Sequence, residues 1–220
     1  MHQINFRNSI ADIDCEEENF PTIAVPCRGG IYGPSECGKS TFIYNLLKYR
    51  DSVFAEKFTR IIYCMPEQTE GSRAAYIASL REICENISIE EGLPDLHNHS
   101  LKSDSEPKLL ILDDLSTALL RHSDYVQLMT VGSHHHNLSI IYTSQNYYQK
   151  SSDGRTFQRQ LTMKVMFEDR SDRTVLTNIS RQTFGSTTYL HRCFELLKRR
   201  CPEENHPYLF IGTYISKNSI

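Results

Sequence analysis

A short glycine-containing stretch, Gly33–Thr41, constrains this chain more than any other part of the sequence. It reads Gly-Pro-Ser-Glu-Cys-Gly-Lys-Ser-Thr and fits the pattern G-x-x-x-x-G-K-[ST]. The run Thr22–Tyr32 before it predicts a strand, and the apolar spacing after it predicts a helix to about Tyr49. A glycine loop between a strand and a helix presents backbone N–H groups and the positive end of the helix. That combination binds phosphate.

The residue types in this loop suit a nucleoside triphosphate. Gly33 and Gly38 let the backbone turn and approach phosphate where a Cβ would collide. Lys39 is expected to reach the β- and γ-phosphates of ATP, and the Ser40 hydroxyl is expected to bind Mg²⁺. A chance match in a turn is the alternative, and the flanking strand and helix argue against it. The predicted nucleotide-binding residues are Gly33, Pro34, Ser35, Glu36, Cys37, Gly38, Lys39, Ser40 and Thr41.

Two adjacent carboxylates follow an apolar run later in the chain. Leu109–Leu112 predicts a buried strand, and Asp113 and Asp114 come directly after it. A P-loop enzyme needs a carboxylate near Ser40 to orient the magnesium ion, and we expect Asp113 to be that group. Hydrolysis also needs a water that is positioned and relieved of a proton, and Asp114 is the candidate base. The alternative is that these aspartates cap a following helix.

A glutamine, Gln145, follows another predicted strand, Leu138–Thr143. Polar side chains at the carboxyl ends of strands lie on the edge where doubly wound sheets bind ligands. Gln145 is therefore a candidate to contact the γ-phosphate or the attacking water. A loop glutamine that faces solvent is the alternative.

Apolar strands alternate with helical patterns along the chain, which favours an α/β fold with a parallel sheet and helices on both faces. We expect a single domain over residues 1–220, with an irregular lead-in over 1–21. The predicted strands beyond the first are Arg60–Met65, Lys108–Leu112, Leu138–Thr143, Leu161–Phe167 and Tyr208–Ile215. The predicted helices after the one following the glycine loop are Ala74–Asn86, Ala118–Val131, Arg173–Thr183 and Thr187–Arg200, and 97–107 is expected to be a surface loop.

Composition narrows the classes of partner. The formal net charge of −3 gives no overall attraction to nucleic acid, so any DNA contact must come from local basic patches or from a ring that concentrates them. No apolar run approaches the roughly 18 residues of a membrane span, so no span is expected. The seven cysteines form no C-x-x-C pair, which favours reduced thiols in a cytosolic or nuclear compartment and argues against zinc.

Taken together, these motifs resemble the viral genome-packaging ATPases of the FtsK–HerA superfamily, of the poxvirus, virophage and Maverick/Polinton type. The resemblance runs through Gly33–Thr41, Glu91–Pro94, Leu109–Leu115 and Gly132–Asn146. The last block is the most specific, because serine and histidines before a strand that ends in glutamine–asparagine are unusual elsewhere. The resemblance implies an ASCE-type strand order of 5-1-4-3-2, with Gln145 as the sensor.

The resemblance also implies a function and partners. It implies an ATP- and Mg²⁺-dependent homo-oligomeric ring, a pentamer or hexamer, that moves double-stranded DNA into a preformed capsid. Viral capsid or vertex proteins would be partners, and the protein would act in the cytoplasm or nucleus of an infected host cell, or be associated with the virion. Hydrolysis in such motors is usually completed by an arginine from a neighbouring subunit. Arg155 is the first candidate for that arginine, with Arg170 and Arg173 behind it.

Two other functions remain open at the level of sequence. One is a P-loop kinase that acts on a small molecule such as a nucleoside or nucleotide. Such kinases need an arginine-rich lid, yet 71–107 holds only Arg73 and Arg81 as arginines. The other is a non-catalytic assembly protein in which ATP binding only orders a ring. The paired aspartates favour an enzyme that activates water over a kinase or a non-catalytic assembly protein.

Overall fold

The computed structural model describes residues 22–67, 73–95, 101, 106–119, 124, 127–128, 136–148, 152–169, 172–212 and 214–215. The expected lead-in over 1–21 lies outside the described residues, as do most of the expected surface loop over 97–107 and most of the expected helix over 118–131. Within the described part, no helix combines the length and the apolar character that a membrane crossing requires.

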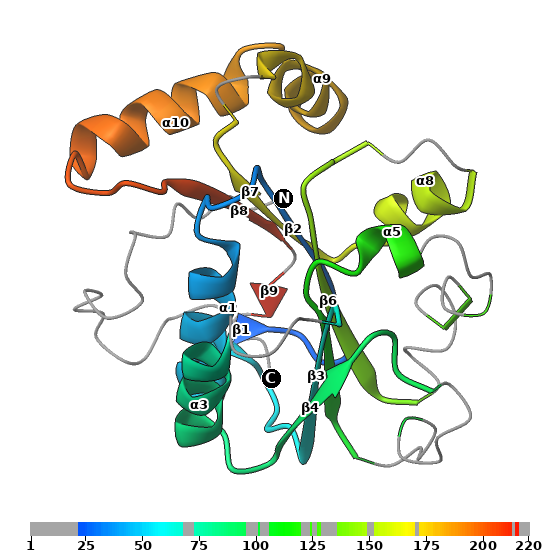
Figure 1. Cartoon of the computed structure of the whole chain (residues 1–220). Coiled ribbons are helices and arrows are strands. Elements are labelled where there is room, and N and C mark those ends of the chain that lie inside the picture. The colour runs from blue at the N-terminus through cyan, green and yellow to red at the C-terminus, as the bar shows by residue number, and fades with distance from the viewer. Residues whose placement is uncertain are drawn as a thin grey trace.

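A mostly parallel sheet of seven strands forms the centre of the molecule (Figure 1). Five of the strands follow the spatial order β7-β2-β6-β5-β3, and adjacent strands within this set of five pair in parallel. Numbered along the chain, this is the order 5-1-4-3-2, so the predicted order is confirmed. The five strands are β2 (Arg28–Tyr32), β3 (Arg60–Met65), β5 (Lys108–Leu112), β6 (Leu138–Ser144) and β7 (Met163–Phe167).

Helices lie on both faces of this sheet, as predicted (Figure 1). The helices α1 and α3 cover one face, α5 and α8 lie on the other, and α9 and α10 pack over β7 and β8. A short helix, α2, follows α1. The bounds are α1 (Lys39–Lys48), α2 (Arg50–Val53), α3 (Ala74–Ile83), α5 (Ser116–Leu119), α8 (Ser152–Arg159), α9 (Arg173–Phe184) and α10 (Tyr189–Arg200).

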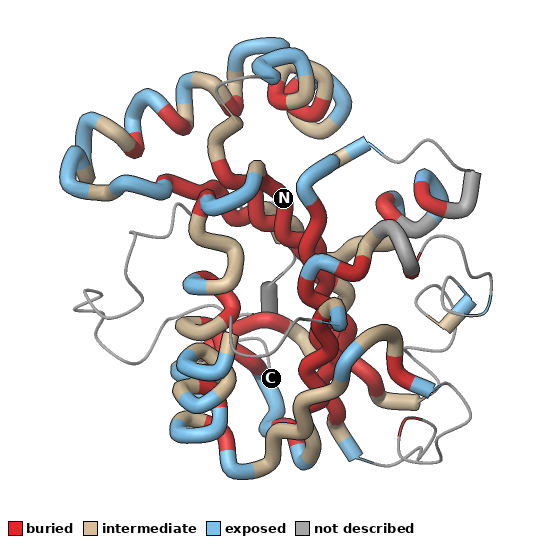
Figure 2. The backbone as a smooth tube through the Cα atoms, in the orientation of Figure 1, coloured by how far each residue is buried: buried red, intermediate tan, exposed pale blue. Residues whose placement is uncertain are grey.

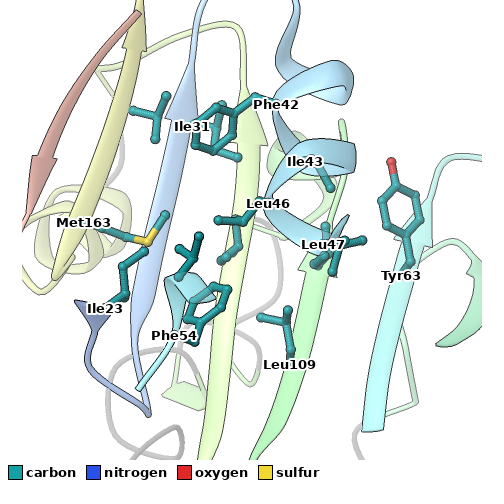
Figure 3. Packing of buried hydrophobic residues seen from close by; sticks show 14 of the residues in the cluster. Ile23, Ile31, Phe42, Ile43, Leu46, Leu47, Phe54, Tyr63, Leu109 and Met163 are labelled. Atoms are coloured by element: carbon teal, nitrogen blue, oxygen red, sulfur yellow. The ribbon is translucent and has the colours of Figure 1, made fainter. Parts of the chain in front are cut away.

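The helix α1 is held against the sheet by an apolar stripe. Its side chains Phe42, Ile43, Leu46 and Leu47 are all buried, at the i, i+1, i+4 and i+5 spacing of one helix face. Figure 3 shows these side chains pointing toward the strands and meeting residues such as Ile31. The central strands are buried along their length, which Figure 2 shows as a continuous red band. This packing fixes where α1 begins, and therefore where the preceding loop lies.

The segment after α3 differs from the prediction. The helix expected over Ala74–Asn86 ends at Ile83, and Ile87–Glu91 forms an edge strand, β4, that pairs in parallel with β3. Its two isoleucines, Ile87 and Ile89, pack against the core while the strand stays half-exposed. The strand is short, and only three residues, 84–86, separate it from the helix, so the sequence pattern does not distinguish the two elements.

Two further predicted strands are each split in the structure. The run expected as one strand over Thr22–Tyr32 divides into β1 (Thr22–Ile23) and β2, with Pro26 between them, a residue that has no N–H for a ladder. The closing run expected over Tyr208–Ile215 divides into β8 (Tyr208–Gly212) and β9 (Tyr214–Ile215). Strand β8 pairs antiparallel with β7, and β9 pairs antiparallel with β1 in a separate two-stranded sheet. The main sheet is therefore not wholly parallel.

Candidate functional site

The predicted phosphate loop joins β2 to α1. Gly38, which precedes the helix, has a φ of +97°, in the left-handed region that favours glycine. Gly33 has no room for a side chain, because an added Cβ would lie 2.6 Å from the Sγ of Cys37 and 2.7 Å from the Cβ of Phe167. The glycines at both ends of the loop are thus required by its conformation. Glu36 is exposed, so its carboxylate has access to solvent.

The ammonium group of Lys39 lies over this loop. Its Nζ donates to the carbonyl oxygen of Gly33 at 2.8 Å and to that of Pro34 at 2.6 Å. A lysine carries three donors on a flexible stem, so it can exchange such acceptors for phosphate oxygens without a change in the backbone. The loop therefore places the charge where a triphosphate would be bound.

The Asp113 carboxylate accepts hydrogen bonds from several parts of the chain. The residue is only 2% exposed, and its backbone N–H donates to the carbonyl of Cys64 on β3. Its Oδ1 accepts from the hydroxyl of Thr143 on β6, at 2.9 Å. Its Oδ2 accepts from three side chains, namely the Tyr63 hydroxyl at 2.5 Å, the Arg73 guanidinium at 3.3 Å and the Ser40 hydroxyl at 3.5 Å.

The tyrosine that bonds Asp113 is held in its protonated form. Burial above all, and then the charge of the neighbouring Asp113 carboxylate, raise the pKa of the Tyr63 hydroxyl far above its ordinary value. A phenol with a raised pKa keeps its proton, so it remains a donor throughout the range in which proteins are stable. Tyr63 thereby fixes the orientation of the Asp113 carboxylate.

The pair Ser40 and Asp113 suits a magnesium ion. The hydroxyl of the first and the Oδ2 of the second lie 3.5 Å apart, at the start of α1 and the end of β5. Mg²⁺ prefers oxygen ligands and is usually bound by one or two carboxylates together with substrate phosphates and waters. Among the residues that the structure describes, no group of three or more His, Cys, Asp or Glu side chains could hold a metal ion. The two oxygens of this pair match a magnesium ion whose other ligands are phosphate oxygens and waters.

Two further predicted catalytic groups, Asp114 and Gln145, lie at the same sheet edge. Asp114 is exposed and has a φ of +58°, and its backbone N–H donates to the Thr143 hydroxyl at 2.7 Å. This tight turn directs consecutive carboxylates differently, since Asp113 is buried and Asp114 is not. Gln145 follows β6 directly and is also exposed. The helix-cap alternative for Asp113 is disfavoured, because both of its oxygens accept from distant elements.

One pocket of about 400 Å³ gathers most of the predicted site. That volume lies within the usual range for small-molecule sites. Of the predicted loop residues, Gly33, Pro34 and Cys37 do not line it. The lining residues are Ser35, Glu36, Gly38, Lys39, Ser40, Thr41, Arg73, Asp113, Asp114, Gln145 and His206.

Two of these lining residues were not predicted as part of the site. Arg73 directly precedes α3, and His206 lies in the segment before β8, where its Cβ is close to Gly38. No local motif marks either residue. In the sequence, Arg73 is one of few arginines between the second and third predicted strands. Its position after the carboxyl end of a strand could have indicated the same sheet edge.

The predicted arginine finger is not part of this pocket. Arg155 is exposed on α8, and it does not line the pocket. Arg173 is exposed at the start of α9, and Arg170 lies outside the described residues. Arg155 therefore stays a prediction.

Comparison with known proteins gives the fold. No protein-family model matches the chain, and no curated protein matches it by sequence. Among solved structures, the genome packaging NTPase B204 of Sulfolobus turreted icosahedral virus 2, in complex with ATP-gammaS, is similar with a TM-score of 0.55 and 15% identity. The match covers 89% of this chain and 98% of that one. The chain has the P-loop NTPase fold.

Weaker matches come from larger secretion ATPases. Thermomonospora curvata EccC (ATPases 2 and 3), in complex with a signal sequence peptide, matches with a TM-score of 0.46 and 14% identity, over 72% of this chain and 36% of that one. EscN, from the type III secretion system of enteropathogenic E. coli, matches with a TM-score of 0.43 and 11% identity, over 64% of this chain and 43% of that one. The chain thus spans less than half the length of either secretion ATPase.

Proposed function

We propose that this protein hydrolyses ATP and uses the energy to move double-stranded DNA into a viral capsid. The observation that carries the proposal is the convergence of Lys39, Ser40, Asp113, Asp114 and Gln145 on one pocket. These residues come from α1 and from the ends of β5 and β6, and the sequence predicted a role for each of them. A phosphate-binding loop is common to all P-loop proteins and does not by itself indicate hydrolysis. The two aspartates beside it favour hydrolysis.

Each residue would have a distinct chemical role. Lys39 would bind the β- and γ-phosphates, and Ser40 with Asp113 would hold the magnesium ion, which neutralises phosphate charge when bound. The exposed Asp114 carboxylate would orient the attacking water and accept its proton. Gln145 would contact the γ-phosphate or that water, and so transmit the presence of the γ-phosphate to β6.

The DNA-packaging part of the proposal has two supports. The motif blocks of the sequence resemble viral packaging ATPases, and the fold matches a viral genome packaging NTPase over nearly the whole of both chains. Packaging further requires a homo-oligomeric ring, a pentamer or hexamer, and a capsid or vertex protein as partner. The protein would then act inside an infected host cell. With a net charge of −3, DNA contacts would come from local basic groups brought together by the ring.

The test is the ATPase rate of the purified protein with and without duplex DNA. We expect duplex DNA of any sequence to stimulate phosphate release, and the stimulation to weaken as salt rises, because the contacts are to backbone phosphates. Lys39→Ala should abolish both basal and stimulated hydrolysis. Arg81→Ala, an exposed change on α3 outside the pocket, is the matched control and should leave both rates unchanged.

Three results would contradict the proposal. Hydrolysis that is indifferent to DNA, in a protein that does not bind DNA, would remove the motor function. Phosphate transfer to a nucleoside or nucleotide would identify a kinase. Tight nucleotide binding without turnover, under all conditions of DNA, capsid and salt, would identify an assembly protein.

A further inference from the structure

The Arg73 side chain holds a position that the proposed hydrolysis does not explain. Its guanidinium is 3.3 Å from the Oδ2 of Asp113, which is also the oxygen nearest to the Ser40 hydroxyl. The Arg73 side chain is 28% exposed, whereas that of Asp113 is 3% exposed. Arg73 also lines the nucleotide pocket itself. It therefore occupies the side of Asp113 on which a magnesium ion would bind.

The electrostatics of this pair have a direct consequence. A buried carboxylate needs a compensating positive charge, and Arg73 provides it in this arrangement. If Asp113 binds a magnesium ion, that ion supplies the compensating positive charge in place of Arg73. Two cationic groups would then compete for one oxygen, so the guanidinium is expected to leave.

The guanidinium can leave without disturbing the carboxylate. Tyr63 and Thr143 are buried, and they bond Asp113 on Oδ2 and Oδ1 respectively. They remain as partners and keep its orientation. Arg73 stands at the junction between 68–72 and α3, with its guanidinium partly in the open pocket. A guanidinium in a pocket meant for a triphosphate finds phosphate oxygens as its alternative acceptors.

We propose that Arg73 is a γ-phosphate-binding residue of the same subunit, which pairs with Asp113 until nucleotide binds and then transfers to the γ-phosphate. This inference rests on the proposed function, because it takes the pocket to be an ATP site. It goes beyond that function by giving the subunit its own arginine for distinguishing ATP from ADP. The distinction would not require a neighbouring subunit.

The test is the ratio of the dissociation constants for ADP and ATPγS, each measured with Mg²⁺ by calorimetry on the full chain. Both nucleotides bind together with Mg²⁺, so the free-energy cost of separating Arg73 from Asp113 is the same for both. That cost therefore cancels in the ratio of the two dissociation constants. Only ATPγS offers a γ-group. We expect Arg73→Gln to lower the preference for ATPγS by about 10-fold or more, the range of a charge-assisted hydrogen bond. ADP affinity should be retained or should rise, because the variant has no Arg73–Asp113 pair to separate.

Three further variants complete the experiment. Arg73→Lys keeps a charge that can contact phosphate, so it should recover part of the lost preference. Arg81→Gln, exposed near the other end of α3, is the matched control and should preserve the ratio. Should Arg73→Gln fail to fold, Arg73→Met retains the aliphatic stem and is expected to show the same loss.

The outcomes separate the two proposals. An unmodified protein that binds neither nucleotide would overturn the proposed function and this inference together. Normal binding, with an unchanged ratio in Arg73→Gln, would overturn the inference alone. An equal loss of ADP and ATPγS affinity would give Arg73 a structural role only, and would overturn it as well.

Discussion

At the scale of single residues, the proposed chemistry of this protein depends on how one carboxylate is held. Asp113 is buried, and four side chains from four different elements or segments converge on it. Burying a charge is unfavourable unless it is paired and hydrogen-bonded. These partners therefore offset the free-energy cost of burying the charge. They also fix the orientation of the carboxylate.

The bond from Tyr63 makes a testable contribution to stability. Tyr63→Phe removes the donor at 2.5 Å and leaves the ring, so a buried carboxylate loses one partner. We expect the free energy of unfolding to fall by about 1–3 kcal/mol, as measured by urea denaturation. Tyr49→Phe, at the end of α1, is the control, and its change should stay within about 0.5 kcal/mol. Equal changes in the two variants would show that the bond contributes little.

At the scale of elements, sequence patterns predicted the buried parts well and the edges poorly. Strands β3, β5 and β6 are buried at nearly every position, and each was predicted within a residue of its observed bounds. Strand β4 was missed because an edge strand needs only one apolar face, which Ile87 and Ile89 supply. Local sequence cannot show that β3 offers it a partner. The division of the closing run into β8 and β9 was missed for the same reason, because β9 pairs with β1 at the other end of the chain.

The end of α9 gives a prediction at this scale. The helix is closed by Gly185, which has a φ of +69°, and an added Cβ there would meet nothing within 4 Å. The cost of Gly185→Ala is therefore purely one of backbone conformation, about 1–2 kcal/mol.

Thermal or urea unfolding would measure this cost. Gly185→Asn should lose less than Gly185→Ala, because asparagine tolerates the left-handed region better than alanine does. Neither change should alter the proposed ATP hydrolysis, since Gly185 does not line the proposed nucleotide pocket. A smaller loss for alanine than for asparagine would contradict this account.

At the scale of the whole molecule, the proposed ring places part of each active site on another subunit. Arg155 is exposed on α8 and does not line its own pocket, so any catalytic contact from it must reach a neighbour. Arg155→Ala should lower hydrolysis by about 1,000-fold while nucleotide binding is retained.

Mixing of subunits tests this prediction directly. Subunits with Lys39→Ala are inactive but still present Arg155, so they should restore hydrolysis in neighbouring Arg155→Ala subunits. Arg159→Ala, one turn further along α8 and also exposed, is the control and should remain active by itself. An inactive mixture, or full activity in Arg155→Ala alone, would exclude Arg155 as the arginine finger.

The sequence by itself determined the local patterns: a predicted phosphate loop at Gly33–Thr41, carboxylates after one strand and a glutamine after another. These are short patterns whose physical requirements lie within a few residues. Only the tertiary structure decided which groups meet. Ser40 and Asp113 are 73 residues apart in sequence, and Arg73 is 40 residues from Asp113. Their contact depends on the order and register of the strands, which long-range packing of the sheet sets.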